Sequence, residues 1–361
     1  MRRVLVIFWC LWGLFPGAPC KAQSPPAPSF NHSVAVAFGG ELGLHVALRV
    51  SEAMARIGAM QKASLWLERD KSVQLAKLAY EKTDAEVLRD VQPLAWMIYR
   101  PVITEQEKIG KPPNLGVRST ATIVHPARFP DLLKNALLQP KQMLLHRKLL
   151  DYEQRILRRF VQVSAAMPGT GAPADSLNKQ FEPQFAVIAN ELHAITLLRD
   201  QLPDLQNGLW QHPDVVAAAM RQALELAPDN PMLWYARGTA DYQLQRTQDA
   251  LDAFDRCIDM LPGFAQALHE RGTAYLRLHL TTLAVADYDA AIRLQPRNAD
   301  FFRSRGSAYL VDEDFVPMCR DFYTACSLGA CDNYHWATSR GHCQQDTTST
   351  APTAPTSPAA Q

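Results

Sequence analysis

The sequence reads YARGTADY at 235–242, HERGTAYL at 269–276 and RSRGSAYL at 303–310. The three stretches are evenly spaced along the chain, and each carries an Arg-Gly pair at the same point. Other positions recur in the same register. An aromatic residue follows each glycine at one constant separation, and a proline follows the first two glycines at another. Agreement at several positions of one period predicts a repeated structural unit.

The recurring residues suit pairs of helices that pack closely. Glycine and alanine let two helices approach each other, the aromatic side chain fills the space between units, and proline ends each pair because it cannot continue a helix. The pattern resembles the tetratricopeptide repeat (TPR), a 34-residue helix–turn–helix unit, over residues 195–330. A half-matching unit ends at Pro228, one period before Pro262. The resemblance implies a mainly α fold, an α-helical solenoid of about three to four repeats in which stacking makes the core continuous.

The resemblance also implies a binding surface, because in this family the first helix of each unit lines a concave groove that takes a peptide segment of another protein. By their offsets from the glycines, eight residues line the expected groove: Tyr235, Thr239, Gln243, His269, Thr273, Arg277, Arg303 and Ser307. The lysines and asparagines with which one subclass clamps a C-terminal carboxylate are absent from these positions. The mixed polar groove with two arginines is compatible with an acidic or polar peptide. The alternative is that the short array only contacts its own N-terminal domain.

Each repeat glycine follows an arginine, at Arg237, Arg271 and Arg305. We expect these arginines to pair locally with aspartates on the following helices, rather than to bind a ligand, because ion pairs of this kind are common. The candidate partners are Asp255, Asp289 and Asp321. Cys257 stands where the repeat takes a small buried residue, so we expect an inert core thiol there.

The first residues have the three-part pattern of a secretory signal. Met1-Arg2-Arg3 is basic, residues 4–15 are nearly all apolar, and small side chains at Cys20 and Ala22 favour cleavage after Ala22. We therefore predict a signal peptide at 1–22, a spacer at 23–29 and a periplasmic or secreted protein without an integral membrane segment after cleavage. A buried N-terminal helix is the alternative, and Pro19 argues against lipid attachment at Cys20.

Four of the remaining cysteines gather near the end of the repeats, at Cys319, Cys326, Cys331 and Cys343. In an oxidising compartment such a cluster predicts two disulfides, with three pairings left open. Zinc ligation together with nearby histidines is the alternative, but the spacing matches no common zinc pattern. We expect residues 330–343 to form a cap that covers the last apolar face of the array.

Residues 30–166 are expected to form a separate, small α+β domain that ends in a long helix. Its elements are predicted as strands at 34–38, 96–104 and 117–124, and as helices at 41–61 and 84–94. Turn residues at 110–114 predict a hairpin with a wide loop, and Pro101 indicates an edge strand or a bulge. The domain resembles the N-terminal domain of flagellar assembly protein T and related exported bacterial lipoproteins, although no short motif carries that likeness. Gly39-Gly40 does not complete a nucleotide-binding fingerprint.

The long helix is predicted from an apolar stripe with helical spacing: Leu145, Leu149, Tyr152, Ile156, Phe160 and Val163. We expect its arginines at 155, 158 and 159 to lie on the solvated side. Residues 167–176 are then a linker, 177–345 the helical repeat domain with its cysteine-rich cap, and 346–361 a disordered Thr/Pro-rich tail.

Composition and motifs exclude several classes of protein. The 361 residues carry 37 Lys+Arg against 36 Asp+Glu, and a net charge of +1 argues against a dedicated binder of nucleic acid or anionic membranes. No hydrolase, metalloprotease, phosphate-loop or haem motif is present, so we name no catalytic residue, metal or cofactor. We interpret the chain as an exported adaptor whose partner is another protein, in cell-envelope assembly. The alternatives are a structural subunit whose repeats pack inside an envelope complex, and an enzyme with an unrecognised site in its N-terminal domain.

Overall fold

The computed structural model describes residues 29–38, 44–70, 91, 93–111, 114–126, 128–137, 139–165 and 174–343. The predicted signal peptide, nearly all of the spacer, the C-terminal tail and most of the helix predicted at 84–94 lie outside these residues. Within the described ranges, no helix combines the length and the apolar character needed to cross a membrane.

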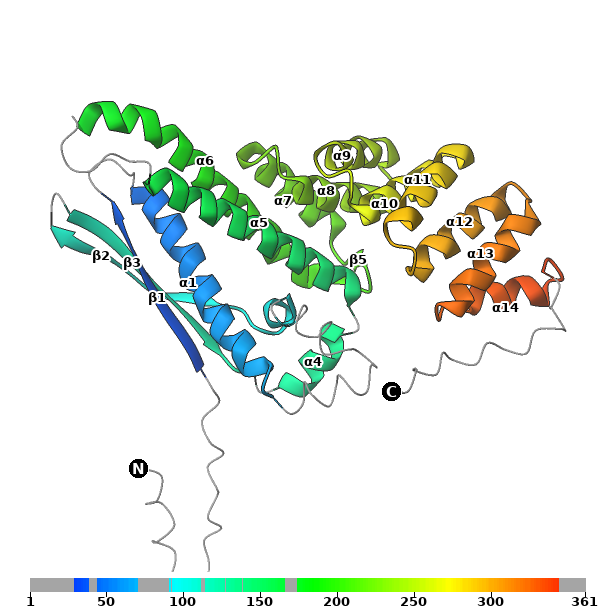
Figure 1. The fold of residues 1–361 in the computed structure, drawn as a ribbon, viewed down its shortest axis with the longest axis horizontal. Helices are drawn as coiled ribbons and strands as arrows, with labels where there is room; N and C mark the ends of the chain where they lie inside the picture. Colours follow the sequence, from blue (N-terminus) through cyan, green and yellow to red (C-terminus); the bar gives the residue numbers. More distant parts are fainter. Residues whose placement is uncertain are drawn as a thin grey trace, which may run out of the picture.

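A three-stranded antiparallel sheet flanks the helices of the N-terminal half (Figure 1). Its strands are β1 (Ser29–Phe38), β2 (Val102–Lys111) and β3 (Asn114–Val124), in the order β1-β3-β2. The strands predicted at 34–38 and 117–124 are confirmed, and both begin earlier than expected. The reason is that β1 and β3 pair along their whole length, from Ser29 opposite Val124 to Phe38 opposite Leu115.

The strand predicted at 96–104 is wrong in its first part. Residues 93–98 are helical and β2 begins only at Val102. A short apolar run fits a buried helix as well as a buried strand, and here Trp96 joins a buried cluster with α1. Pro101 lies directly before β2, which is an edge strand with a register shift between Ile103 and Glu105. The hairpin loop is tighter than predicted, since the strands continue to Lys111 and Asn114.

Helix α1 (Leu44–Leu67) packs across β1 and β3, as Figure 1 shows. The helix predicted at 41–61 is confirmed and extends further, because Ala63, Ser64 and Leu67 are also buried. The hydroxyl groups of Ser51 and Ser119 hydrogen-bond at 2.7 Å and join the helix to the central strand inside the core.

Three helices follow the sheet: α4 (Phe129–Leu137), α5 (Pro140–Ala165) and α6 (Ala174–Gln201). The predicted stripe of α5 faces inward, with Leu145, Leu149 and Ile156 buried, whereas its three arginines are exposed. Helix α6 packs against α1 and α5, and Arg199 joins α5 through a 2.6 Å ion pair with the buried Glu153. The division predicted at 167–176 stays a prediction, since residues 166–173 are not described.

The C-terminal half is built from antiparallel helix pairs, which Figure 1 shows stacked side by side. A short 3-10 turn (Leu202–Asp204) and a two-stranded hairpin, β4 (Leu205–Gln206) and β5 (Leu209–Trp210), lead into them. The helices are α7 (Pro213–Leu226), α8 (Pro231–Gln243), α9 (Thr247–Met260), α10 (Ala265–Arg277), α11 (Thr281–Leu294), α12 (Ala299–Val311), α13 (Phe315–Ser327) and α14 (Asp332–Ser339). The predicted solenoid, preceded by a small sheet region, is confirmed. We call α8–α9, α10–α11 and α12–α13 the first, second and third units.

The repeat glycines lie where the two helices of each unit touch. A Cβ atom at Gly238 would come within 2.7 Å of the Phe254 ring, and one at Gly306 within 2.6 Å of the Phe322 ring. No side chain fits at these distances, so the glycine and the recurring aromatic residue that follows it specify one contact together.

The turn inside each unit holds a second periodic feature, which the sequence analysis missed. Gln245, His279 and Glu313 recur with the period of the repeat and have φ angles of 61°, 60° and 56°. These values lie in the left-handed region, which residues other than glycine rarely adopt. The repeat therefore gives this turn the same backbone conformation in each unit, although three different residue types occupy the position and the sequence alone does not reveal it.

The buried residues are distributed unevenly along the chain. One continuous cluster runs from Val36 in β1 through α5 and α6 to Phe264 and Ala274 beyond the first unit. Buried residues of α11, α12 and α13 belong instead to three smaller clusters. The N-terminal half, the first unit and part of α10 thus share one core, to which the buried residues of α11, α12 and α13 do not belong.

Candidate protein-binding surface of the repeats

The part of the groove that belongs to the first unit is filled by the chain itself. The backbone N–H of Trp210 donates to Oε1 of Gln243 at 2.8 Å, and Nε2 of Gln243 donates to the Trp210 carbonyl oxygen at 3.1 Å. The indole Nε1 of Trp210 donates to Oγ1 of Thr239 at 2.9 Å. Two of the eight predicted groove residues therefore hold the β4–β5 hairpin in this structure.

Tyr235, the third predicted groove residue of this unit, is a core residue. It is 4% exposed, and its ring centroid lies 4.9 Å from that of Phe264. Burial raises the pKa of its hydroxyl well above the usual value. Helix α5 contributes to this cover, since Nζ of Lys148 lies 5.6 Å from the Phe264 ring centroid.

Helix α5 also reaches the second unit, through Lys141 and Glu270. Their Nζ and Oε1 atoms lie 3.1 Å apart. Burial pushes the pKa of Glu270 upward, but the hydrogen bond from His269 and the positive charge of Lys141 outweigh it and lower the pKa to about 2. Glu270 is therefore ionised at neutral pH and anchors the N-terminal half to α10.

Beyond this contact, α10 and α12 carry the other five predicted groove residues. His269 stacks on Phe301 with ring centroids 5.1 Å apart and hydrogen-bonds Ser304 at 2.8 Å. Thr273 and Ser307 donate their hydroxyl hydrogens to carbonyl oxygens of the preceding turn of their own helices. These three side chains are partly buried, so they present limited polar surface to a partner.

Arg277 and Arg303 are the exposed members of the predicted groove. The guanidinium of Arg277 lies 3.4 Å from the Tyr242 ring centroid and donates to the Tyr242 carbonyl oxygen at 2.6 Å. Arg303 forms a 2.8 Å ion pair with the equally exposed Asp300. An exposed pair of this kind is weak, so the charge of Arg303 stays accessible to a ligand. The binding role of all eight residues stays a prediction.

The arginines before the glycines join neighbouring units. Arg271 contacts Asp287 of its own unit and Asp255 of the first unit, each at 2.7 Å. Arg305 bridges the second and third units in the same way, through Asp289 and Asp321.

Arg305 pairs as expected with Asp321 of the following helix, whereas Arg237 and Arg271 do not use the expected partners on their following helices. Arg237 contacts Asp241 of its own helix at 3.3 Å, and Arg271 contacts Asp287 in place of Asp289. Asp287 was not among the expected partners. It stands one repeat period before Asp321, and that recurrence is the signal that would have revealed it.

Cys257 is fully buried, and burial raises the pKa of its thiol to about 12, as expected for an inert core residue. Helix α14 covers the end of the array, where Ala337 and Cys343 pack on Met318 and Phe322.

The structure places the four clustered cysteines in two close pairs. These pairs are Cys319 with Cys343 and Cys326 with Cys331, which have Cα atoms 5.6 and 3.9 Å apart. The second pair also lies close to His335, with possible ligand atoms within 4.8 Å of one another. The geometry suits disulfides, whereas a metal ion would need the second pair as reduced thiolates. The disulfides therefore stay a prediction.

Comparison with known proteins agrees with the repeat geometry. Residues 212–263 and 269–316 match the family model described as "Tetratricopeptide repeat". These residues form tetratricopeptide repeats. The TPR fold serves as an interaction scaffold for other proteins, so the match supports protein–protein interaction as the role of this half of the chain. Among curated proteins, no sequence matches this chain significantly.

Several solved structures are similar to part of this chain. MamA is 19% identical, with 42% of this chain and 92% of MamA covered and a TM-score of 0.35. The Arabidopsis OM64 TPR domain is 21% identical, with 30% and 92% covered and a TM-score of 0.30. YrrB, described as a TPR protein with an unusual peptide-binding site, is 14% identical, with 57% and 97% covered and a TM-score of 0.35. This level of likeness concerns the fold alone.

Proposed function

We propose that this protein is an adaptor that binds an acidic or polar segment of another protein along α10 and α12. The observation that carries the proposal is the uneven cover of the groove. In the first unit, Trp210 covers the predicted groove residues Thr239 and Gln243. In the later units, Arg277 and Arg303 are exposed. Two exposed guanidinium groups on one face favour a ligand with carboxylates or other acceptor oxygens.

The contacts of the hairpin in the first unit support this proposal. A single amide side chain, Gln243, holds both the N–H and the carbonyl oxygen of Trp210. Hydrogen bonds to main-chain groups can form with a bound segment of almost any sequence. The hydrogen bond from the Trp210 side chain to Thr239, in contrast, depends on the residue type. We infer that a partner segment continues along the same face from the point where the hairpin ends.

Location in the periplasm and a role in cell-envelope assembly are further parts of the proposal. They rest on the signal-like residues 1–22 and on the clustered cysteines. The resemblance of residues 30–166 to the flagellar assembly protein T domain is itself part of the proposal. The mass of the unreduced protein tests the cysteine part. We expect it to be lower than that of the reduced chain by the four hydrogen atoms that two disulfides remove. Full alkylation without prior reduction, together with bound zinc, would contradict the disulfides.

A second function is favoured by a specific observation, the shared core. The cluster that runs from Val36 to Phe264 joins the first unit to the N-terminal half, and the Lys141–Glu270 contact joins α10 of the second unit to it. A repeat array that serves to hold its own chain together is what a structural subunit of an envelope complex requires. This candidate predicts that the exposed arginines contribute nothing to partner binding.

Photo-crosslinking of the full-length protein separates the two functions. A photoreactive residue in place of Ser307 should capture a defined partner, and the combined change Arg277→Glu and Arg303→Glu should reduce that capture at least about tenfold. Arg256→Glu with Arg293→Glu is the matched control, because both residues are exposed on the second helices of their units. Equal capture by both double variants would refute the adaptor and favour the structural subunit.

A further inference from the structure

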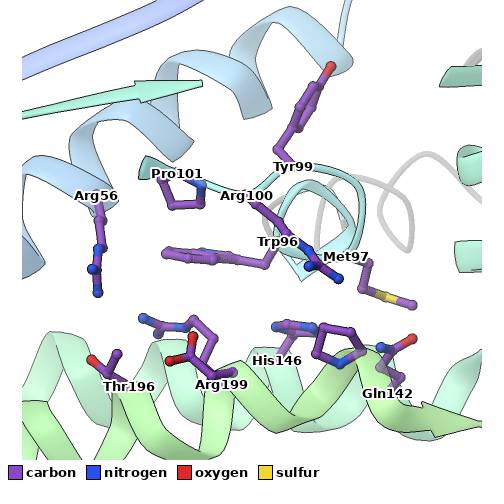
Figure 2. A pocket seen from close by; sticks show the side chains of 12 residues that line it. Arg56, Trp96, Met97, Tyr99, Arg100, Pro101, Gln142, His146, Thr196 and Arg199 are labelled. Atoms are coloured by element: carbon purple, nitrogen blue, oxygen red, sulfur yellow. The ribbon is translucent and has the colours of Figure 1, made fainter. Parts of the chain in front are cut away.

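A cavity outside the repeats lies where α1, the segment 96–101, α5 and α6 meet (Figure 2). Its volume is about 170 Å³. Figure 2 shows Arg56 pointing from α1 toward Thr196 and Arg199 of α6, with the Trp96 ring lying between Pro101 and Arg199. The N-terminal half thus has a pocket of its own, bounded by elements far apart in the sequence.

The three arginines that line this cavity differ in their partners. Arg199 is neutralised by Glu153, at 3.2 and 2.6 Å, and its guanidinium lies 4.0 Å from the Trp96 ring centroid. Arg56 has no hydrogen bond or ion pair with any described residue, and its Nε atom is buried without a partner. Arg100 lies exposed at the rim. A buried guanidinium nitrogen without an acceptor destabilises a protein unless something supplies that acceptor.

The charge of the lining also lacks a counterion. Arg56, Arg100 and Arg199 carry three positive charges, against the carboxylates of Asp200 at the rim and Glu153 behind Arg199. One positive charge is therefore left over, which matches a ligand with a single negative charge.

The remaining walls are both apolar and polar. Trp96, Met97 and Pro101 form one side, and Pro203 lies on another. An apolar cavity of about 150 Å³ holds one benzene ring in a protein core, so this space suits a molecule of about that size. The lining residues His146 and Gln142 carry polar groups that can orient a ligand.

We propose that this cavity binds a compact organic monocarboxylate, with its carboxylate on the Arg56 guanidinium and its apolar body against Trp96. The planar guanidinium fork matches a carboxylate in two parallel hydrogen bonds. Small inorganic anions have no apolar surface to bury against Trp96, so this wall does not increase their affinity. This site is separate from the groove of the repeats and does not depend on the proposed adaptor function.

Titration calorimetry on the full-length protein tests the site, with benzoate as the probe. We expect benzoate to bind with about millimolar affinity or tighter, and neutral benzamide to bind at least about tenfold more weakly. Arg56→Gln should weaken benzoate binding at least about tenfold and leave the melting temperature of the free protein unchanged or raised, because it removes a buried guanidinium nitrogen that has no acceptor. The control is Arg158→Gln, an exposed change on α5.

Three results would overturn the proposal. They are absence of benzoate binding at millimolar concentration, equal benzoate affinity in the Arg56→Gln protein, and tighter binding of inorganic phosphate than of benzoate. A fall in melting temperature with Arg56→Gln alone would show that Arg56 stabilises the fold instead. Arg199 is not a suitable position for this test, since its loss would leave Glu153 buried and unpaired.

Discussion

The first and third units follow the same repeat pattern but have different surroundings. In both units the glycine of the first helix meets the aromatic ring of the second at nearly the same distance. The inner face of α8 is covered by Trp210 and α5, whereas α12 exposes Arg303. The recurring residues therefore specify the helix pair and its core. The polar residues that differ between units, such as Gln243 and Arg303, determine whether another part of the chain covers the inner face.

The largest expected effect comes from emptying the first unit. Trp210→Ala removes a buried indole and its hydrogen bond to Thr239, so we expect a loss of about 3–5 kcal/mol in the free energy of unfolding. Urea denaturation measures it. Trp336→Ala is the control, because Trp336 is 40% exposed and its loss should cost far less. Equal losses of unfolding free energy in the two variants would mean that the packing of the hairpin on α8 does not stabilise the fold.

The arginines before the glycines sharpen the comparison between units. Arg305→Met should cost about 2–3 kcal/mol, since it leaves Asp321 buried without its partner. Arg237→Met should cost about 1 kcal/mol or less, because Asp241 keeps Arg246 at 3.5 Å. Chemical denaturation of both variants checks the difference, and the reverse order would contradict the bridging role of Arg305.

The glycines test whether the core is the same in every unit. Gly238→Ala, Gly272→Ala and Gly306→Ala should each cost about 1–3 kcal/mol, because each new Cβ meets an aromatic ring at 2.9 Å or less. Thermal unfolding measures the set. Gly263→Ala is the control, as a Cβ there meets nothing within 4 Å. If only one of the three substitutions lowered the stability, the glycine–aromatic contact would not be equivalent in the three units.

The smallest expected effect concerns the Lys141–Glu270 contact and its pH dependence. The folded-state pKa of Glu270 lies at about 2, below its ordinary value of 4.5, because His269 and Lys141 favour its ionised form. These contacts therefore stabilise the fold above pH 4.5 and are lost as the pH falls toward 2. Because Lys141 is 46% exposed, we expect only about 1 kcal/mol.

Glu270→Gln should therefore lower the unfolding free energy at pH 7 and match the unaltered protein near pH 2. The control is Glu225→Gln, an exposed change on α7 that should show no such pH dependence. A constant difference across this pH range would show that the carboxylate charge is not what joins α5 to α10.

The repeats could be predicted from sequence because their contacts are local and periodic. Gly272 and Tyr288 have the same separation in sequence as Gly238 and Phe254, and the pair recurs in each unit. The N-terminal strands were harder to predict. Most residues of β2 are polar and exposed, since an edge strand has little to bury, so alternation did not mark it.

The cover of the groove could not be predicted for a different reason. The contact between Trp210 and Gln243 joins residues that belong to no shared pattern, and nothing in the periodicity shows which segment lies on the inner face. Arg56 was not singled out either, because its missing partner becomes visible only when α1 and α6 are placed together.

The repeats lie partly in the long cluster shared with the N-terminal half and partly in three short clusters of their own, and this has a consequence for motion. Stacked repeats can open from a free end, one unit at a time, when only neighbouring units hold them. The first unit is fixed to the sheet through the long cluster, so amide hydrogen exchange should be slowest there and should quicken toward α13. A protein bound to both Arg277 and Arg303 would thus connect α10, which the N-terminal half holds, to the less firmly held α12, and would slow the opening of the later units.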